Sequence, residues 1–563
     1  MSSVIVFSKD RPMQLHGYLE SLIWASGCSE EQIFVLYREV LPISYDKVKS
    51  YFPNVHWIAE VNFGQQLQTI IDASDEYIMF GCDDVLFMDT FDLQEMQAYL
   101  ADHDDVVGFS LRLGANITPL PKKTQKDGKY FTWRWTQATG HYGYPWELDC
   151  TLYRKKDVQG IARKMGLENV KSPNYFEAIP EEKPEEYISR DRLAAYYERS
   201  KAIVITVNRV QETHLNKVDD SKITDVLSLF IKYHYEDRFL DLENLRKKTY
   251  TKVHVGSEYF QLTASDVVEN RAVDNKKWRN LFQNLRILAS GNLETAFRKY
   301  QKDSIVHAEL GPMISCKRNT KVLNPEETVK TLSEMPKSFC RFGDGEFMLM
   351  LGRSIGFQNY DPILALKLWQ IFQKGTQNIY VGVPYQQFQT PDDFNQWIKE
   401  FYYTSGRWVR NFLSRYLSRD RELYIDTGFN QVYQTYANMN FAAYYEAVRK
   451  LFERKKLTLV VGKDILSNLD YNIFDLAESI EYIYGPTKDA YSKYNEILEE
   501  ALKTDKDRLI CVILGPTSKV LVYDLTEHGY IAWDIGHLAK DYDAYRKRIS
   551  RTKEQIGRFY APD

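Results

Sequence analysis

The chain has 563 residues, of which 44% are hydrophobic and 27% charged, and its formal net charge is only -4. This length exceeds what one hydrophobic core supports, so we expect two or more domains. The near balance of charge excludes a general electrostatic attraction to nucleic acid. No apolar run approaches the roughly 18 residues of a membrane span, and the chain starts with an apolar strand pattern. We therefore expect a cytoplasmic protein, free or attached peripherally to the inner face of a membrane.

The six cysteines are scattered along the chain, with no Cys-x-x-Cys pair. Several fall inside apolar strand patterns, where cysteine behaves as a small buried hydrophobic residue. This usage indicates a reducing compartment and argues against structural zinc. The cysteines are Cys28, Cys82, Cys150, Cys316, Cys340 and Cys511.

The first part of the chain alternates apolar strand patterns with helical patterns, which is typical of α/β layers. No Gly-x-Gly-x-x-Gly follows the first strand, so the dinucleotide-binding fingerprint is absent. We predict one domain over residues 1–215. Its expected strands are 4–8, 32–37, 56–61, 77–81, 106–111, 130–136 and 202–207.

Charged segments with a helical period follow, at 225–235, 240–247 and 276–288, and predict a helical connector over residues 216–311. From residue 312 to residue 563 strands and helices alternate again, which favours a parallel, Rossmann-like sheet. The predicted fold class is α/β, with two Rossmann-like domains joined by the connector. The expected strands of the last domain are 338–342, 378–383, 422–426, 457–461, 481–484, 509–514 and 530–533.

Two acidic turns each close an apolar strand. Asp83 and Asp84 follow the strand at 77–81, and Asp344 and Glu346 follow the strand at 338–342. Carboxylates are costly to bring together at a sheet edge unless a cation or a polar ligand lies between them. A hard divalent ion that shares its oxygen ligands with a diphosphate is the commonest solution. The two turns therefore predict two nucleotide-sugar sites in tandem.

The turn after the first strand contains Ser8, Asp10 and Arg11. A nucleotide base and ribose commonly bind at this edge of an α/β sheet, so Asp10 could hold the base or ribose and Arg11 a phosphate. Helix capping and turn chemistry would explain Ser8 and Asp10 equally well.

These pieces resemble the GT-A class of family-2-like glycosyltransferases over roughly residues 1–215. Residues 4–12 look like the family's first strand and base-binding turn, and Cys82-Asp83-Asp84 looks like its D-x-D motif with cysteine in the first place. The resemblance implies a nucleotide-sugar donor, with Asp84 as metal ligand and Asp83 beside the donor. It also implies an acidic residue that deprotonates the acceptor hydroxyl. The candidates are Asp149, Glu147 and Glu177, with Asp149 preferred.

Four strand-end turns converge in composition in the last domain. The first, 341–346, offers glycine freedom and two carboxylates; the second, at Lys463, opens a helix and could face a phosphate. The third, 515–518, carries hydroxyls that could cap a helix or grip phosphate, and the fourth is 534–537. Each turn alone has an ordinary explanation, but four at successive strand ends indicate a site.

This set resembles the GT-D class of bacterial glycosyltransferases over about residues 312–550. The resemblance implies a Rossmann-like fold, a UDP-sugar and a divalent cation (Mn²⁺ or Mg²⁺), with Asp344 and Glu346 as the essential D-x-E motif. Arg341 is then expected to fork onto the diphosphate. His537 is either a site residue or only the start of a helix. The implied nucleotide-sugar contacts are Arg341, Gly343, Lys463, Gly515, Pro516, Thr517, Asp534 and His537.

The leading hypothesis is a bifunctional hexosyltransferase that adds two sugars in succession to a bacterial surface glycan, glycolipid or glycoprotein. Tethering would raise the effective concentration of the intermediate at the second site. The alternative keeps only the C-terminal domain active and makes the N-terminal domain a degenerate carbohydrate-binding or scaffolding module. A phosphatase or nucleotidyltransferase is disfavoured, since the chain lacks a D-x-D-x-T nucleophile and a Walker lysine motif.

Overall fold

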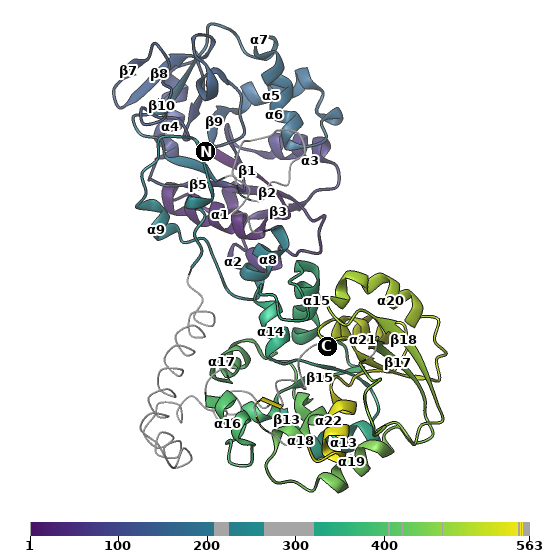
Figure 1. The fold of residues 1–563 in the computed structure, drawn as a ribbon. Helices are drawn as coiled ribbons and strands as arrows, with labels where there is room; N and C mark the ends of the chain where they lie inside the picture. Colours follow the sequence, from purple (N-terminus) through teal and green to yellow (C-terminus); the bar gives the residue numbers. More distant parts are fainter. Residues whose placement is uncertain are drawn as a thin grey trace, which may run out of the picture. The chain divides into compact units, whose positions relative to one another are not determined.

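A computed structural model describes residues 2–205, 207, 225–263, 320–403, 406–418, 420–463, 465–549, 552 and 554–555. The chain divides into two compact units, Met1–Ala264 and Ser265–Asp563, and each is built around its own sheet (Figure 1). The mixed α/β class with two Rossmann-like sheets, predicted from the sequence, is confirmed.

The first unit contains a nine-stranded sheet in the order β3-β2-β1-β4-β9-β6-β10-β8-β7. Strands β1 to β4 pair in parallel, whereas β9 runs antiparallel between β4 and β6. The acidic turn after β4 therefore lies at the carboxyl edge of the parallel part. The strands are β1 (Ser2–Lys9), β2 (Ile33–Arg38), β3 (His56–Ala59), β4 (Tyr77–Cys82), β6 (Val106–Ser110), β7 (Gln125–Asp127), β8 (Tyr130–Arg134), β9 (Thr151–Arg154) and β10 (Leu193–Tyr197).

A second, three-stranded sheet of this unit has the order β12-β11-β5. Its strands are β5 (Val85–Phe87), β11 (Ala202–Ile205) and β12 (His254–Val255). The described part of the expected connector, 225–263, contributes β12 to this sheet and is part of the first unit. Residues 216–224 and 264–311 of the expected connector lie outside the described residues. The predicted domain limits 1–215, 216–311 and 312–563 stay a prediction.

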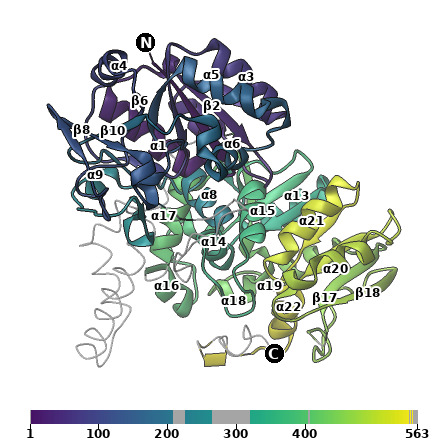
Figure 2. The same ribbon diagram turned by 90° about the horizontal axis from the view of Figure 1, so that it is seen from above.

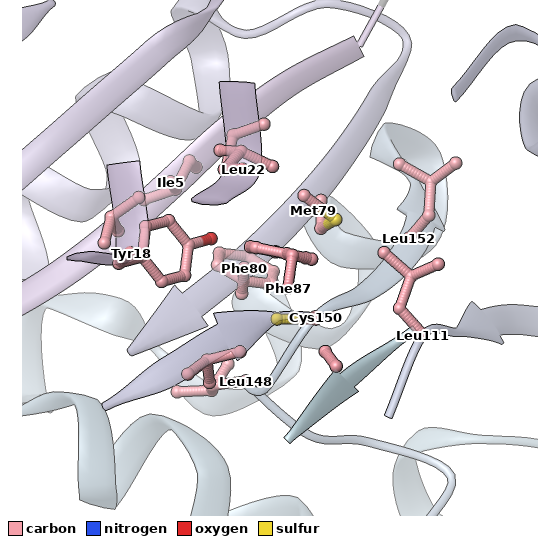
Figure 3. Packing of buried hydrophobic residues seen from close by; sticks show 14 of the residues in the cluster. Ile5, Tyr18, Leu22, Met79, Phe80, Phe87, Leu111, Leu148, Cys150 and Leu152 are labelled. Atoms are coloured by element: carbon pink, nitrogen blue, oxygen red, sulfur yellow. The ribbon is translucent and has the colours of Figure 1, made fainter. Parts of the chain in front are cut away.

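The core of the first unit is formed where β1 and β4 pack against α1 (Figure 3). Helix α1 begins at Pro12, which suits the first position of a helix, and ends at Gly27 in the left-handed conformation. Tyr18 and Leu22 of α1 lie over the strands, and Cys150 behaves as a buried hydrophobic residue, as the sequence predicted. The helices are α1 (Pro12–Ser26), α2 (Asp46–Tyr51), α3 (Phe63–Ala73), α4 (Leu93–Asp102), α5 (Lys155–Met165), α6 (Pro173–Glu182), α7 (Pro184–Tyr187), α8 (Val226–His234) and α9 (Leu242–Arg246).

The second unit contains an eight-stranded sheet in the order β13-β16-β15-β14-β20-β19-β17-β18. In its described residues neighbouring strands pair in parallel, as expected. Helices cover such a sheet on both faces, so its central strands are continuous apolar runs, and all five residues of β19 are buried. The strands are β13 (Lys321–Val322), β14 (Ser338–Arg341), β15 (Ile379–Val383), β16 (Leu423–Asp426), β17 (Lys456–Gly462), β18 (Ser479–Gly485), β19 (Leu509–Ile513) and β20 (Ala532–Asp534).

Helices separate these strands along the chain, and Figure 2 shows α20 beside β17 and β18 at one edge of the unit. The helices are α13 (Pro325–Glu334), α14 (Asp344–Met350), α15 (Pro362–Gln373), α16 (Gln396–Tyr403), α17 (Gly406–Tyr416), α18 (Val432–Thr435), α19 (Phe441–Lys450), α20 (Tyr494–Ala501), α21 (Thr517–Glu527) and α22 (Leu538–Arg546). Within the described ranges of the chain, no helix combines the length and the apolar character that crossing a membrane requires.

Candidate functional site

The four turns singled out in the second unit follow four consecutive strands of its sheet, β14, β20, β19 and β17. Because these strands are parallel, their carboxyl ends meet at one edge. The topology therefore gathers the predicted residues of four distant sequence segments along that edge.

Arg341, the last residue of β14, is buried and held by Asp534 at the end of β20. Its Nε donates to the Asp534 backbone oxygen over 2.8 Å, and its Nη2 donates to Asp534 Oδ1 over 3.1 Å. Gly536 has φ +44°, and a Cβ there would overlap the Arg341 guanidinium. The protein itself therefore fixes the orientation of Arg341, and Gly536 leaves the space that the guanidinium occupies.

Lys519, on the first turn of α21, was not among the residues predicted from the sequence. Its Nζ lies 2.7 Å from Glu346 Oε1 and 3.1 Å from Asp534 Oδ2, and it donates to the Gly515 carbonyl oxygen over 3.1 Å. Lys519 is only 2% exposed. One buried ammonium therefore joins three of the four turns. The only sequence signal was its position, two residues after Thr517 in a helix that opens at the sheet edge.

Asp534 carries the negative charge that these two cations share. Burial would raise the pKa of its carboxyl, but Arg341 and Lys519 outweigh burial and hold that pKa below its ordinary value. Asp534 is therefore ionised at neutral pH and forms a fixed part of the cluster.

The two acids of the turn after β14 have different surroundings. Glu346 is buried, and its Oε2 accepts from the backbone N–H of Gly343 over 2.9 Å while its Oε1 faces Lys519. Asp344, the first residue of α14, is exposed. The sequence predicted that both acids face one ligand; in the structure Asp344 is exposed, whereas Glu346 is buried against Lys519.

A divalent cation would suit this edge chemically. Three oxygens, from Glu346, Asp534 and Gly515, already surround the positive charge of Lys519, and hard cations prefer oxygen ligands. Among the described residues, however, no group of three or more histidine, cysteine, aspartate or glutamate side chains is arranged to hold a metal ion. Asp344 and Glu346 provide only two carboxylates, so a cation held by them would need further oxygen ligands, for example those of a diphosphate.

The turn after β19 combines a left-handed glycine with buried hydroxyls. Gly515 has φ +56°, and the ring of Phe357 approaches it closely. The Thr517 hydroxyl donates to Gln358 Oε1 over 3.2 Å and is fully buried, so the protein already uses this hydroxyl. Pro516 stands at the N-cap of α21. Phe357, which is 37% exposed, was missed because its loop lies far from this turn in sequence.

The remaining predicted residues of this edge are Lys463 and His537. Lys463 is exposed directly after β17, and the expectation that it opens a helix is wrong, because the described residues between β17 and β18 form turns. His537 precedes α22, and burial together with the positive charge of Arg341 lowers its pKa to about 3. The imidazole is therefore neutral at physiological pH.

In the first unit, the buried side chain of Arg11 pairs with the carboxylates of the acidic turn. This guanidinium forms ion pairs with Asp83 and, over 3.3 Å, with Asp84 Oδ2. Ser8 Oγ also donates to Asp83 Oδ2 over 2.7 Å. Burial raises the pKa of Asp83 to about 6 against the opposing effect of Arg11. Asp83 is fully buried whereas the Asp84 side chain is 19% exposed, so Asp84 is the more accessible of the pair.

The Asp10 side chain connects the turn after β1 to the loop after β2. Its φ is +55°, and its Oδ1 accepts from the backbone N–H groups of Val40 and Leu41 over 2.7 and 3.0 Å. The carboxylate thus fixes the loop after β2, 30 residues away along the chain, and this is neither the local turn chemistry nor the base contact considered for Asp10.

A buried arginine that the sequence did not reveal, Arg112, organises the three candidate bases. Its Nε lies 2.7 Å from Glu147 Oε2 and its Nη1 lies 3.5 Å from Asp149 Oδ2. Glu147 also accepts from the Thr151 hydroxyl and from the backbone N–H of Asp149. Glu147 is therefore enclosed by protein partners, and Asp149 is the less buried member of this pair.

The acids and imidazoles around Arg112 have shifted pKa values. Burial raises the pKa of Glu147 to about 7, and burial together with Asp149 raises the pKa of Glu177 to about 8. His141 and His254 lie with ring centroids 5.1 Å apart, and burial lowers the pKa of each to about 4. His254, on β12, also interacts electrostatically with Asp84, a proximity that no local sequence pattern indicated.

Comparison with known proteins identifies the C-terminal region. Residues 339–561 match the family model described as "Glycosyltransferase GT-D fold". This range includes all four strand-end turns of the second unit. The C-terminal part of the chain therefore carries a GT-D-fold domain.

Curated relatives are glycosyltransferases by name. The chain is 31% identical over 237 residues to a probable glycosyl transferase Gly of Streptococcus gordonii, covering 41% of this chain and 34% of that protein. It is 29% identical over 299 residues to the bifunctional glycosyltransferase pgtA of Dictyostelium discoideum, covering 45% and 38%. The matches thus span little more than a third of each relative's length. A solved structure described as a distinct glycosyltransferase fold is 35% identical, with a TM-score of 0.40, covering 44% of this chain and 87% of that one.

Proposed function

We propose that the chain is a glycosyltransferase whose C-terminal unit transfers a sugar from a UDP-sugar to a glycan acceptor. The observation that carries this proposal is the cluster of Arg341, Lys519, Asp534 and Glu346 at the edge where four consecutive strands end, inside the region that matches the GT-D model. Such an edge is where α/β folds bind nucleotides.

Different residues of this edge have different roles in donor binding. The N-terminus of α21 presents N–H groups that favour a diphosphate. Asp344 and Glu346 would hold Mn²⁺ or Mg²⁺, which supplies charge neutralisation for the departing diphosphate. Arg341, Lys519 and Asp534 keep Glu346 and the glycine turns in place before the donor arrives.

The first unit is proposed as a second, GT-A-like transferase site, with Asp84 toward the metal and diphosphate. Asp149 is the preferred base for the acceptor hydroxyl. Glu177 is less suitable, because burial and the neighbouring Asp149 raise its pKa to about 8, which favours its protonated form at neutral pH. A bifunctional enzyme would add two sugars in succession to a bacterial surface glycan, glycolipid or glycoprotein, which would place it in the cytoplasm at the inner face of the membrane.

A specific observation favours the alternative, in which the first unit only binds carbohydrate or acts as a scaffold. Arg11 already neutralises both carboxylates of the Cys82-Asp83-Asp84 turn, and Asp83 is fully buried. A metal at this turn would have to compete with an internal cation.

The test of the C-terminal assignment is UDP release from a panel of UDP-sugars, with acceptor glycans, measured with and without Mn²⁺. Asp344→Asn should lower turnover at least about a hundredfold, since it removes charge stabilisation of the leaving group. The matched control is Asp361→Asn, which keeps the N-cap hydrogen bonds of α15 and should leave turnover unchanged. Full turnover by Asp344→Asn would refute the assignment.

A further inference from the structure

The cluster contains a cation of its own, which has consequences for any divalent cation that binds there. Lys519 Nζ lies within 3.1 Å of Glu346, Asp534 and the Gly515 carbonyl, and its side chain is 3% exposed. A buried ammonium is stable only where opposite charges and acceptors compensate it. Glu346 and Asp534 provide that compensation.

The partners of Glu346 matter most for this point. Its two carboxylate oxygens have different partners, Gly343 N–H for Oε2 and Lys519 for Oε1. A divalent cation bound by Glu346 would therefore lie close to the Lys519 ammonium or would replace it at Oε1. Either arrangement brings two positive charges near each other, which weakens cation binding.

Asp534 does not depend on Lys519 in the same way. Arg341 also pairs with Asp534, so this carboxylate keeps one cation if Lys519 is removed. Glu346 would keep only the hydrogen bond from Gly343 among the contacts described above. The effect of Lys519 should therefore be concentrated on Glu346.

We propose that Lys519 is an internal counter-ion of the acidic turn: it keeps Glu346 in place when no divalent cation is bound, and it sets the concentration at which a divalent cation occupies the turn. This inference rests on the proposed function, which assigns the cation of the donor diphosphate to Asp344 and Glu346. Lys519 is a positioning residue in this account, because it acts through Glu346. The diphosphate oxygens of a donor would offset the extra positive charge of Lys519. We therefore expect the donor and the divalent cation to bind the turn together more tightly than the cation binds alone.

The test measures Mn²⁺ affinity in the full chain, by counting free Mn²⁺ with electron paramagnetic resonance, and thermal stability with and without Mn²⁺. All proteins carry Asp84→Ala, so that the first unit does not contribute through that residue. Lys519→Gln removes the charge and keeps a hydrogen-bond donor. It should bind Mn²⁺ about tenfold more tightly, have a lower Tm without the ion, and gain more in Tm on adding it. The matched control is Lys493→Gln, an exposed lysine paired with Glu496, which should change none of these.

Lys519→Arg keeps the positive charge and should keep Mn²⁺ affinity within about twofold of the parent. This variant decides the matter if Lys519→Gln does not fold: a tenfold gain in affinity in Lys519→Arg would overturn the inference. An unchanged Mn²⁺ affinity in a folded Lys519→Gln, with only a lower Tm, would also overturn it and leave Lys519 a purely structural residue.

Asp344→Asn separates this inference from the proposed function. It should abolish Mn²⁺ binding at the turn. If Asp344→Asn binds Mn²⁺ as the parent does, the cation assignment in the proposed function is wrong, and the inference falls with it. If Asp344→Asn loses binding while Lys519→Gln and the parent bind equally, only the inference is wrong.

Discussion

In both units, the pKa values of buried carboxyl groups depend strongly on their surroundings. Asp426, at the end of β16, is 2% exposed and accepts from the backbone N–H groups of Gly428 and Tyr385 over 2.8 and 3.0 Å. Burial raises its pKa to about 7 in spite of these bonds and of Arg341. The folded state therefore retains a proton that the unfolded state releases near pH 4.

This difference predicts a pH-dependent effect of Asp426→Asn. Between about pH 4 and pH 7 the folded protein binds more protons than the unfolded one, so Asp426 lowers the free energy of unfolding as pH rises, by up to about 1.4 kcal/mol per pH unit. Asparagine can still accept both N–H groups and does not ionise. The difference in free energy of unfolding between Asp426→Asn and the wild type should therefore favour the variant more at pH 7.5 than at pH 5, as measured by urea unfolding of the second unit. Equal differences at the two pH values would contradict the assignment.

Tyr18 gives a second prediction at this scale. Among the described residues its hydroxyl is buried and has no hydrogen-bond partner. Burying an unpaired hydroxyl costs about 1–3 kcal/mol, so Tyr18→Phe should raise the Tm or leave it unchanged. The control is Tyr153→Phe: the Tyr153 hydroxyl accepts from the Glu147 N–H over 2.9 Å, and its loss should destabilise by about 1 kcal/mol. A clear loss of stability in Tyr18→Phe would show that the hydroxyl has a partner.

At the scale of elements, the turns after the strands decide whether the site can form. The apolar runs of β1, β14 and β19 identified these strands from sequence because continuous burial leaves a strong pattern. β9 and β12 were missed, since they are four and two residues long and owe their place to pairing with distant strands. The composition of the turns identified their residues but did not predict the orientation of the side chains. Thr517 donates to Gln358, and Glu346 pairs with Lys519.

Gly536→Ala tests the turn after β20. The position has φ +44°, and a new Cβ would overlap the Arg341 guanidinium that pairs with Asp534. We expect a loss of about 2–4 kcal/mol, from backbone strain plus displacement of Arg341, and a loss of donor turnover. Gly529→Ala is the control: its φ is +81° and no atom lies within 4 Å of the new Cβ, so only the strain of about 1 kcal/mol remains. Equal losses for the two variants would contradict the role given to the Arg341 contact.

For the whole molecule, the sequence predicted the α/β class and the turns that the second sheet aligns on one edge. It could not predict Lys519 or Arg112, because each acts on acids that only the tertiary fold brings near. The same limit applies to His254, which reaches the neighbourhood of Asp84 through a strand of the expected connector. Charged partners from distant segments leave no local pattern, whereas glycine and carboxylate turns do.

The central claim is that each unit holds its own donor site and acts as a transferase on its own donor. The measurement that tests it is UDP release across a UDP-sugar panel for the wild type, Asp84→Ala and the double variant Asp344→Ala/Glu346→Ala, each with and without Mn²⁺. The claim predicts that the double variant loses turnover of one donor while Asp84→Ala loses turnover of another. If Asp84→Ala left every donor's turnover unchanged, the first unit would not be a transferase. If the double variant also kept every activity, the transferase assignment of the C-terminal unit would be contradicted.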